Sequence, residues 1–558
     1  MSDVDPVTLE VLRNALAAVA EEMNATLVRT AYSPNIKDRK DCSCAVFDAD
    51  GELVAQAENI PVHLGAMPYS VAAALESFPP ETLEPGDAVL LNDPFHGGAH
   101  LPDLTLVTPV FVAGELVAFV ANRAHHADVG GARAGSVAAD STEIFQEGLR
   151  IPPVKYVRGG ETDADLRAML LTNVRTPEER RGDLRAQRAA NETGSERLSA
   201  LVDRSDADTL VAAMDAVADY AEARMRSEIA DLPDGEYAFE DELDGDGRGD
   251  GPVPIVAPVT VDGEDVFVDF EGTAGQVDGP VNAPLAVTTS ATYYAVRSVT
   301  DPDVPPCSGA YRPIHVDAPE GTVVNATPPA AVVGGNLEVS QRVVDTLFGA
   351  LAACAPERAV AAGQGTMNSV TFGGHAEESF AFYETVGGGS GGHADGDGMD
   401  GVHVHMSNTL NTPAEVLETA YPLSVRRYEF RQNSGGAGRH RGGLGLRRDI
   451  EVLADGTRFS LLADRRRVGP YGVDGGEAGE PGADYLARDG EWESIPSKST
   501  HELNAGDVVR VETPGGGGCG DPSDRPASAV ERDVRLGKLS AEAARRRYGV
   551  ELGGDGGE

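Results

Sequence analysis

Lysine, cysteine and aromatic residues are all scarce in this chain. Lysine occupies five of its 558 positions, cysteine five and tryptophan one, and aromatic residues make up 5% of the total. A scattered, odd set of cysteines cannot form a disulfide framework, so we expect free, mostly buried thiols and a reducing cytoplasm. The sequence shows no secretory signal pattern and no apolar run of about 18 residues that could cross a membrane.

Positive charge is scarce as well. The chain has 46 Lys and Arg residues against 90 Asp and Glu residues, which gives a formal net charge of −44. Such a surface repels nucleic-acid phosphates and anionic lipid, so we expect neither nucleic acid nor membrane as a partner. The acidic residues are spread along the whole chain. We therefore interpret them as a halophilic-type surface, whose self-repulsion is screened by salt.

Length and composition predict several domains with apolar cores. A chain of 558 residues is too long for one core, its hydrophobic content is 41%, and its 66 glycines and 35 prolines indicate many turns. The expected fold class is α+β: multi-domain, with mixed sheets, packed helices and a β-rich C-terminal module. We expect an N-terminal α+β region at 1–230, a central one at 231–420, the β-rich module at 421–525 and a helical tail at 526–558.

Hydrophobic periodicity locates the main elements. Helical spacing predicts helices near residues 5–23, 59–75, 280–299 and 340–355, and a mostly helical region at 161–225. In these segments Ser340 is a plausible cap, and Pro177 and Gly194 are possible breaks. Strand patterns predict a hairpin at 40–57, strands at 253–269 and many short strands between 421 and 511.

Histidine and aspartate gather around one predicted β-hairpin, residues 91–131. The outer ends of the two strands of a hairpin lie side by side, so the groups at these ends can meet in space. Imidazole nitrogens and carboxylate oxygens suit zinc, manganese or iron, and three such ligands leave positions open for water or substrate. The residues concerned are Asp93, His96, His100 and Asp103 at one end and His125, His126 and Asp128 at the other.

Within this cluster the spacing favours some ligands over others. His100 and Asp103 lie three residues apart on a turn stiffened by proline, so both can point at one ion. Adjacent residues of a strand face opposite ways, so at most one of His125 and His126 is expected to bind. The other histidine, with Asp128 and Asp93, would orient ligands or act as acid or base. The weaker alternative is that these histidines are hydrogen-bonded core residues.

A second candidate lies in the glycine-rich region at residues 393–405. Three aspartates precede His403 and His405, which would share one face of a strand. The acidic spacing and the closing glutamate of a calcium loop are missing, so a substrate-pocket loop is favoured over a metal site. The Gly-x-Ser-x-Gly pattern at Ser390 lacks the context of a nucleophile elbow. Backbone N–H groups of residues 387–392, and those of residues 334–341, could still approach an oxyanion or a phosphate.

Ordered motifs along the chain carry a family resemblance. They occupy residues 5–33, 37–44, 63–67 (HLGAM), 92–104 (NDPFHGGAHLPDL), 125–131, 279–284 (GPVNAP), 334–347 (GGNLEVSQRVVDTL), 363–368, 421–423, 426–433 (RRYEFRQN), 436–443, 513–520 (TPGGGGCG) and 532–548. Essentially end to end, the chain resembles the B subunit of the hydantoinase/5-oxoprolinase family (N-methylhydantoinase B subunit), which is related to the acetone carboxylase α subunit. Cys519 departs from the family pattern, which commonly has an aromatic residue there.

The resemblance implies a hydrolase that opens a cyclic amide such as 5-oxoproline or a hydantoin. It implies a partner A subunit that binds ATP with Mg²⁺, which agrees with the absence of a Walker A lysine motif here. It also implies a divalent metal, most often manganese, with zinc or iron as alternatives. The family ligands fall on His100, Asp103 and His125, which leaves His126 and Asp128 as the candidate base or orienting groups.

Two other functions remain open at this point. The chain could be the α subunit of an acetone-carboxylase-like ATP-dependent carboxylase, or a non-catalytic scaffold for the A subunit. The leading hypothesis is metal-assisted ring opening by a cytoplasmic hetero-oligomer that is active only with its partner. The sequence does not choose among 5-oxoproline, hydantoin and N-methylhydantoin.

Overall fold

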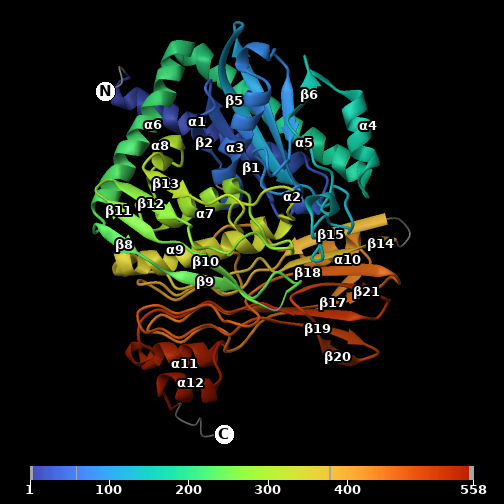
Figure 1. Cartoon of the computed structure of the whole chain (residues 1–558), viewed down its shortest axis with the longest axis vertical. Helices are drawn as coiled ribbons and strands as arrows, with labels where there is room; N and C mark the ends of the chain where they lie inside the picture. Colours follow the sequence, from blue (N-terminus) through green and yellow to red (C-terminus); the bar gives the residue numbers. More distant parts are fainter. Residues whose placement is uncertain (1–3, 58, 250, 376–378, 552–558) are drawn as a thin grey trace.

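The computed structural model describes residues 4–57, 59–249, 251–375 and 379–551. Helices and strands alternate along these segments, and the strands form five sheets against which the helices pack (Figure 1). The N-terminal and C-terminal parts lie at opposite ends of the longest axis, with the central part between them. The expected α+β class with several mixed sheets is confirmed.

A seven-stranded antiparallel sheet forms the N-terminal part, in the order β2-β1-β5-β4-β3-β6-β7. Its strands are β1 (Cys42–Asp48), β2 (Leu53–Gln56), β3 (Ala88–Leu91), β4 (Asp103–Val112), β5 (Glu115–His125), β6 (Val154–Arg158) and β7 (Glu161–Thr162). Helices α1 (Pro6–Thr30) and α5 (Pro177–Ser205) pack in one apolar cluster with residues of β1 and β5. Helix α3 (Pro61–Ser77) packs in a second cluster with other residues of the same two strands. The sheet is therefore covered on both faces, and side chains at its strand ends can be buried.

Of the two breaks predicted in the long helical region, only the one at Pro177 occurs. Helix α4 (Ala164–Thr172) ends before Pro177, which starts α5 as expected. The break predicted at Gly194 is wrong, because α5 continues through it to Ser205. A Cβ at Gly194 would lie 2.5 Å from Met23 Sδ of α1, so this glycine serves close helix packing. Helix α6 (Ala207–Ala230) follows directly.

The central part combines a small mixed sheet with helices. Its sheet has the order β13-β12-β11-β8, and β9 pairs with β10 beside it. The elements are β8 (Gly235–Tyr237), β9 (Glu240–Leu243), β10 (Val253–Val256), β11 (Val259–Asp262), β12 (Asp265–Asp269), α7 (Leu285–Ser298), α8 (Ser308–Tyr311), β13 (Ile314–Asp317) and α9 (Ser340–Cys354). The expectation that Ser340 caps α9 is wrong, because the π-helical turn Gly335–Val339 leads into this helix. The Ser340 hydroxyl instead donates to Asn336 O at 2.8 Å.

Two sheets form the C-terminal part, in the orders β15-β14-β18-β21 and β16-β17-β22-β19-β20. The elements are β14 (Ser369–His375), β15 (Ser379–Thr385), α10 (Ala414–Ala420), β16 (Leu423–Phe430), β17 (Leu446–Val452), β18 (Thr457–Leu462), β19 (Ala483–Arg488), β20 (Glu491–Ser494), β21 (Lys498–Leu503), β22 (Val508–Glu512), α11 (Ala527–Arg535) and α12 (Ala541–Tyr548). Strand β14, which precedes the proposed boundary at residue 420, pairs with β18 beyond it. The division at residues 230, 420 and 525 stays a proposal.

Glycine-rich segments pack against one another beside these sheets. The N–H groups of Gly388, Gly389, Ser390 and Gly392 donate to Val402, Pro514, Met399 and Gly517 carbonyls. A Cβ at Gly516 would lie 1.9 Å from Ser390 O, so only glycine fits. These N–H groups are committed within the fold, which argues against the oxyanion role suggested for residues 387–392.

The thiols are distributed as the sequence indicates. All five cysteines are free and buried. Across the ranges that the structure describes, no helix combines the length and the hydropathy needed to span a membrane.

Candidate metal centre

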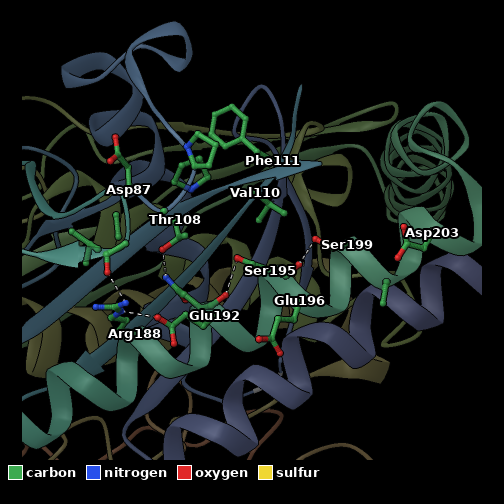
Figure 2. A pocket seen from close by; sticks show the side chains of 18 residues that line it. Asp87, Thr108, Val110, Phe111, Arg188, Glu192, Ser195, Glu196, Ser199 and Asp203 are labelled. Atoms are coloured by element: carbon green, nitrogen blue, oxygen red, sulfur yellow. Dashed lines mark hydrogen bonds and ion pairs between the residues drawn. The ribbon is translucent and has the colours of Figure 1, made fainter. Parts of the chain in front are cut away.

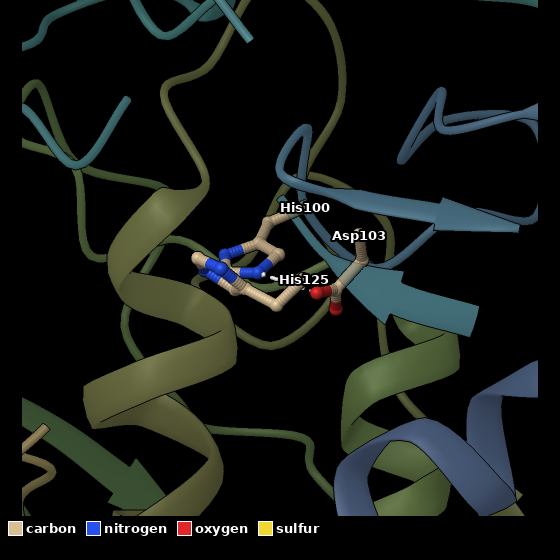
Figure 3. Close-up of side chains that lie close together, drawn as sticks. All are labelled: His100, Asp103 and His125. Atoms are coloured by element: carbon tan, nitrogen blue, oxygen red, sulfur yellow. Dashed lines mark ion pairs between the residues drawn. The ribbon is translucent and has the colours of Figure 1, made fainter. Parts of the chain in front are cut away.

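The β4–β5 hairpin brings the two ends of the predicted metal site together. Asp103 begins β4 and His125 ends β5, and the strand register pairs these two residues directly. His100 lies in the turn before β4, where its carbonyl accepts the Asp103 N–H at 3.0 Å. Candidate ligand atoms of His100, Asp103 and His125 all lie within 4.8 Å of one another (Figure 3). The three residues that the sequence favoured therefore do converge.

These three side chains are shielded from solvent. Asp103 and His100 are 0% exposed and His125 is 2% exposed, and His100 Nε2 lies 3.0 Å from Asp103 Oδ1. Burial opposes ionisation of Asp103, but the imidazoles of His100 and His63 outweigh it and hold the pKa of Asp103 well below its usual value. Burial and the nearby His100 lower the pKa of His125 well below the ordinary range. A neutral imidazole beside a carboxylate is the form that binds a metal ion.

The donor set of this trio fits a divalent cation. Two of its buried atoms, His100 Nδ1 and His125 Nε2, have no hydrogen-bond partner among the described residues, and Asp103 Oδ1 has only its contact with His100 Nε2. Buried polar atoms without partners are costly and uncommon in folded proteins. Two imidazoles and one carboxylate are a usual set for zinc or manganese, with positions left open for other ligands. His100, Asp103 and His125 are thus the residues that would hold an ion.

Residues from distant segments orient His125. The Asn35 amide Nδ2 lies 3.1 Å from His125 Nδ1 and donates to His125 O at 2.7 Å. The Tyr383 ring from β15 stacks on the imidazole, with centroids 4.4 Å apart and planes 11° apart. The Arg39 guanidinium bonds to Asn35 Oδ1 and lies over the same tyrosine. The histidine is therefore held from both its ring face and its Nδ1 edge.

Two further ionisable groups border the trio, and the spacing argument missed both. His63 of α3 places Nε2 3.4 Å from Asp103 Oδ2 and 4.0 Å from Asp41 Oδ1. Burial raises the pKa of Asp41, which precedes β1. Both residues lie in motifs that carried the family resemblance, at 37–44 and 63–67. The pattern of the hairpin could not predict them, because Asp41 comes from the residue before β1 and His63 from a helix.

A third residue that the spacing argument missed comes from the central part. Asn336, on the π-helical turn, places Nδ2 3.3 Å from His100 Nε2 and 3.5 Å from Asp103 Oδ2. It lies in the motif at 334–347, so the only sequence signal for it is again the family motif.

His126 and Asp128 form their contacts elsewhere. The His126 ring bonds through Nε2 to Gln187 Oε1 at 2.9 Å, and burial with the nearby Arg180 lowers its pKa to about 4. Asp128 forms an ion pair with Arg175 at 2.9 Å and accepts the Gly130 and Gly135 N–H groups. The His126 backbone N–H donates to Pro102 O at 2.9 Å, in the turn that carries His100 and Asp103. These contacts are those of groups that position the hairpin end.

The rest of the first cluster, Asp93 and His96, forms a pair apart from the trio. His96 pairs with Asp93 at 2.8 Å, its side chain is 61% exposed, and Arg150 contacts the same carboxylate at 3.1 Å. Only His96 of this pair faces solvent, since Asp93 is buried, and neither residue belongs to the converging trio.

The second histidine candidate does not form a metal site among the described residues. His403 and His405 do not share a strand; His403 bonds to Asn411 Oδ1 at 2.6 Å and His405 lies 3.3 Å from Asp345 Oδ1. The strand expectation is wrong because the glycine-rich chain turns here, and His405 takes a left-handed φ of 52°. Aspartates of this region pair with arginines, as Asp400 does with Arg441 at 2.8 Å.

A large cavity lies beside α5, apart from the trio. It has a volume of about 520 Å³ and is lined by residues of β3, β4 and α5 (Figure 2). Some of its polar groups are paired with one another: Arg188 donates to Glu192 at 2.7 Å and Asn191 to Thr108 at 3.0 Å. None of His100, Asp103 and His125 lines it.

Comparison with known proteins places this centre in a family context. The family model described as hydantoinase B/oxoprolinase matches residues 5–522. The chain belongs to the hydantoinase B/oxoprolinase family. It is 42% identical over 551 residues to an uncharacterized protein of Methanocaldococcus jannaschii, covering 98% of this chain and 96% of that protein. A Pseudomonas protein named as a D-/L-hydantoinase subunit is 36% identical, over 99% of this chain and 96% of the relative.

Other members of the hydantoinase B/oxoprolinase family are much longer. 5-Oxoprolinase 1 of Arabidopsis thaliana is 38% identical over 92% of this chain, but the match covers only 42% of that protein. The present chain thus spans less than half the length of such relatives.

Solved structures extend the family comparison. The ATP-dependent caprolactamase from Pseudomonas jessenii superposes with a TM-score of 0.92 at 32% identity, covering 100% of this chain and 98% of the other. An acetone carboxylase chain superposes with a TM-score of 0.90 at 21% identity, over 99% of this chain and 81% of that one. At that lower identity the second likeness shows the shared fold alone.

Proposed function

We propose that this chain is the B subunit of an ATP-dependent cyclic amidohydrolase that opens a hydantoin or 5-oxoproline ring. The observation that carries the proposal is the buried convergence of His100, Asp103 and His125, with one unpartnered ring nitrogen on each histidine, in a chain of the hydantoinase B/oxoprolinase family. Relatives named as a 5-oxoprolinase and as a hydantoinase subunit, and the caprolactamase fold, support a cyclic amide as the substrate class.

The reaction follows from the chemistry of an unstrained amide, which is a poor electrophile. Transfer of a phosphoryl group from ATP to the carbonyl oxygen releases ADP and activates the ring carbon. Water adds to that carbon, the ring C–N bond breaks, and the nitrogen takes a proton. The resulting acyl phosphate reacts with a second water and gives a carboxylate and phosphate. A divalent ion, most often manganese in this family, would supply hydroxide by lowering the pKa of a water ligand toward about 7.

In this proposal the residues around the centre act as metal ligands, as orienting groups or as a base. His100, Asp103 and His125 hold the ion, and Asn35 and Tyr383 fix the orientation of His125. The contacts of the Asp41 carboxylate are long, 3.5 Å to Asn35, 3.9 Å to Arg39 and 4.0 Å to His63, so in this proposal Asp41 is the group that accepts a proton from water. His126 and Asp128, candidates for the base, act in this proposal as orienting groups for the hairpin end.

A partner chain accounts for the ATP half of the reaction. The long 5-oxoprolinases match this chain over only about two-fifths of their length, so a separate A-type subunit would supply the remainder here. The name of the Pseudomonas relative, which describes it as one subunit of a hydantoinase, points the same way. We therefore propose a cytoplasmic hetero-oligomer in which ATP-Mg²⁺ binds the partner.

The test is to co-purify this chain with its A-type partner and measure ATP hydrolysis and ring opening against 5-oxoproline, hydantoin, N-methylhydantoin and caprolactam. We expect ATP-dependent turnover of at least one ring, bound metal in this chain, and no turnover by this chain alone. Acetone with bicarbonate serves as the comparison substrate. Carboxylation of acetone without ring opening would instead establish a ketone carboxylase, and full activity of a metal-free complex would support the scaffold alternative.

A further inference from the structure

Asn336 presents a carboxamide to the metal centre from a rare backbone conformation. It lies on the π-helical turn Gly335–Val339 and is 3% exposed. Its Nδ2 is 3.3 Å from His100 Nε2 and 3.5 Å from Asp103 Oδ2. Turns of this kind are uncommon and occur frequently at functional sites. The turn therefore brings an uncharged donor and acceptor to two of the three candidate ligands.

Both ends of this carboxamide have hydrogen-bonding capacity left. Asn336 Oδ1 is buried and has no hydrogen-bond partner among the described residues. The two Nδ2 contacts are longer than the usual hydrogen-bond range of about 2.7–3.2 Å, so the Nδ2 donor forms only weak hydrogen bonds. A buried amide oxygen without a partner costs stability. The geometry thus favours a ligand that supplies a donor to Oδ1 and an acceptor to Nδ2.

A cyclic amide has this pair of groups. In a small ring the amide bond is held cis, so its N–H and C=O point to the same side. A primary carboxamide also presents an acceptor and a donor side by side, and two such groups pair through two parallel hydrogen bonds, as asparagine does with adenine. An open-chain secondary amide is trans, with N–H and C=O pointing in opposite directions, and can form only one of the two bonds.

We propose that Asn336 is the residue that selects the substrate, by pairing with its cis-amide: Oδ1 accepts the ring N–H and Nδ2 donates to the ring carbonyl oxygen. This inference rests on the proposed ring-opening function and names the part of the substrate that is read. Phosphoryl transfer to the carbonyl oxygen leaves positive charge on the ring N–H, which strengthens its bond to Oδ1. The pairing also holds the ring carbon next to His100 and Asp103 while water adds.

The experiment compares a cyclic amide with its derivative methylated on the amide nitrogen, which has lost the N–H. The probes are 5-oxoproline, caprolactam and the N-methyl form of each. Their affinities for the metal-loaded complex are measured by calorimetry in the absence of ATP. The wild type should bind each N–H form about 100-fold more tightly than its N-methyl form, because a buried acceptor is otherwise left unpaired. In Asn336→Ala the affinity for the N–H form should fall until the affinities for the two forms differ by no more than about threefold.

Two further variants keep the outcome interpretable. Asn336→Asp keeps the shape of the side chain but repels the carbonyl oxygen, so it should also lose binding while retaining its metal and its melting temperature. Asn14→Ala, on the exposed face of α1, should match the wild type throughout. An unchanged preference for the N–H form in Asn336→Ala would overturn the proposal. Loss of metal with equal weakening of both forms would also overturn it, since Asn336 would then only hold the ligands.

Binding and turnover separate this proposal from the broader one. If the wild-type complex binds the rings with the N–H preference but opens none with ATP, the proposed function fails and the pairing by Asn336 stands. If it opens rings but shows no N–H preference, the proposed function stands and the role of Asn336 fails. If no cyclic amide binds at all, both fail.

Discussion

At the scale of single residues, burial decides what each charged or polar group can do. His100 and His96 belong to the same sequence cluster, yet His100 is 0% exposed beside Asp103, whereas the His96 side chain is 61% exposed. A buried imidazole beside a buried carboxylate can bind an ion, while an exposed imidazole paired with one carboxylate gains little. The two histidines therefore form a matched pair for testing the metal centre.

The first prediction concerns this pair. His100→Ala should lower the metal content of the purified complex and reduce its affinity for manganese at least about 100-fold, because one of three ligands is lost. Ring opening should fall in parallel. His96→Ala should retain both metal and activity. The measurements are metal analysis by mass spectrometry and the ATP-dependent ring-opening assay, and equal metal content in the two variants would contradict the proposed ligand set.

The second prediction concerns Glu338, which is buried on the same turn as Asn336. Burial, together with the nearby Asp464, raises the pKa of the Glu338 carboxyl from 4.5 to about 8. Between these two values the folded protein holds a proton that the unfolded chain has released. Stability contributed by this site is therefore fully present below about pH 4.5, falls as pH rises and levels off above about pH 8.

Glu338→Gln mimics the protonated acid and does not titrate, so it removes this loss. The variant should exceed the wild type in free energy of unfolding by about 1–3 kcal/mol near pH 8.5, and the gain should shrink toward about pH 5. Urea unfolding at both pH values measures the difference. The exposed Glu357→Gln is the control and should show no such trend. A gain that is the same at both pH values would rule out the titration of Glu338 as its cause.

At the scale of elements, the hairpin and the glycine-rich segments show two ways in which local sequence is used. The β4–β5 hairpin follows from apolar strands around a turn, and its register sets Asp103 opposite His125. The glycine-rich segments have no side chains to pack, so they approach one another by their backbones, as Gly516 and Ser390 do. Their sequence looks like flexible linker, but tertiary contacts make it part of the packed interior.

The third prediction tests this close approach. Gly516→Ala should lower the free energy of unfolding by about 3 kcal/mol or more, because the new Cβ would meet the Ser390 carbonyl oxygen and the backbone must shift. Gly275→Ala is the matched control, since its Cβ would have its nearest neighbour 3.9 Å away, and it should change stability by less than about 0.5 kcal/mol. Thermal unfolding of both variants measures the effect, and similar melting temperatures would refute tight packing at Gly516.

At the scale of the whole molecule, the large negative net charge makes stability depend on salt. A formal charge of −44 on 558 residues creates self-repulsion that the fold must overcome, and mobile ions screen that repulsion. The same charge makes association with an acidic partner dependent on salt. The halophilic interpretation of the surface therefore predicts at which salt concentration the protein is stable. It predicts nothing about the reaction.

The fourth prediction follows from this screening. Raising KCl from about 0.1 M to about 2 M should raise the melting temperature by several degrees, because the Debye length shrinks from about 10 Å to a few Å. Chloride is chosen over sulfate, which stabilises most proteins by exclusion from their surface. Sucrose at equal osmolality is the control and should raise the melting temperature less. A melting temperature that does not respond to KCl would contradict the halophilic interpretation.

The sequence by itself determined what is local in this protein. The hairpin, the positions of His100, Asp103 and His125, and the helices and strands of each part follow from periodicity, turn residues and spacing. Strand alternation limited the ligands to one of His125 and His126, and the family resemblance chose His125. Its family motifs were enough to place the chain in the hydantoinase B/oxoprolinase family.

Only the tertiary structure decided what surrounds the centre. Asp41, His63, Asn336 and Tyr383 come from four separate segments, and no local pattern predicts that they meet. Packing between distant segments also explains why α5 continues through Gly194. Ser340 likewise lies inside a helical segment that begins before it, at the turn Gly335–Val339. The physical reason is that spacing along the chain fixes neighbours only within one element. Contacts between elements depend on which buried faces fit together, and those contacts set the burial that makes this site suited to a metal ion.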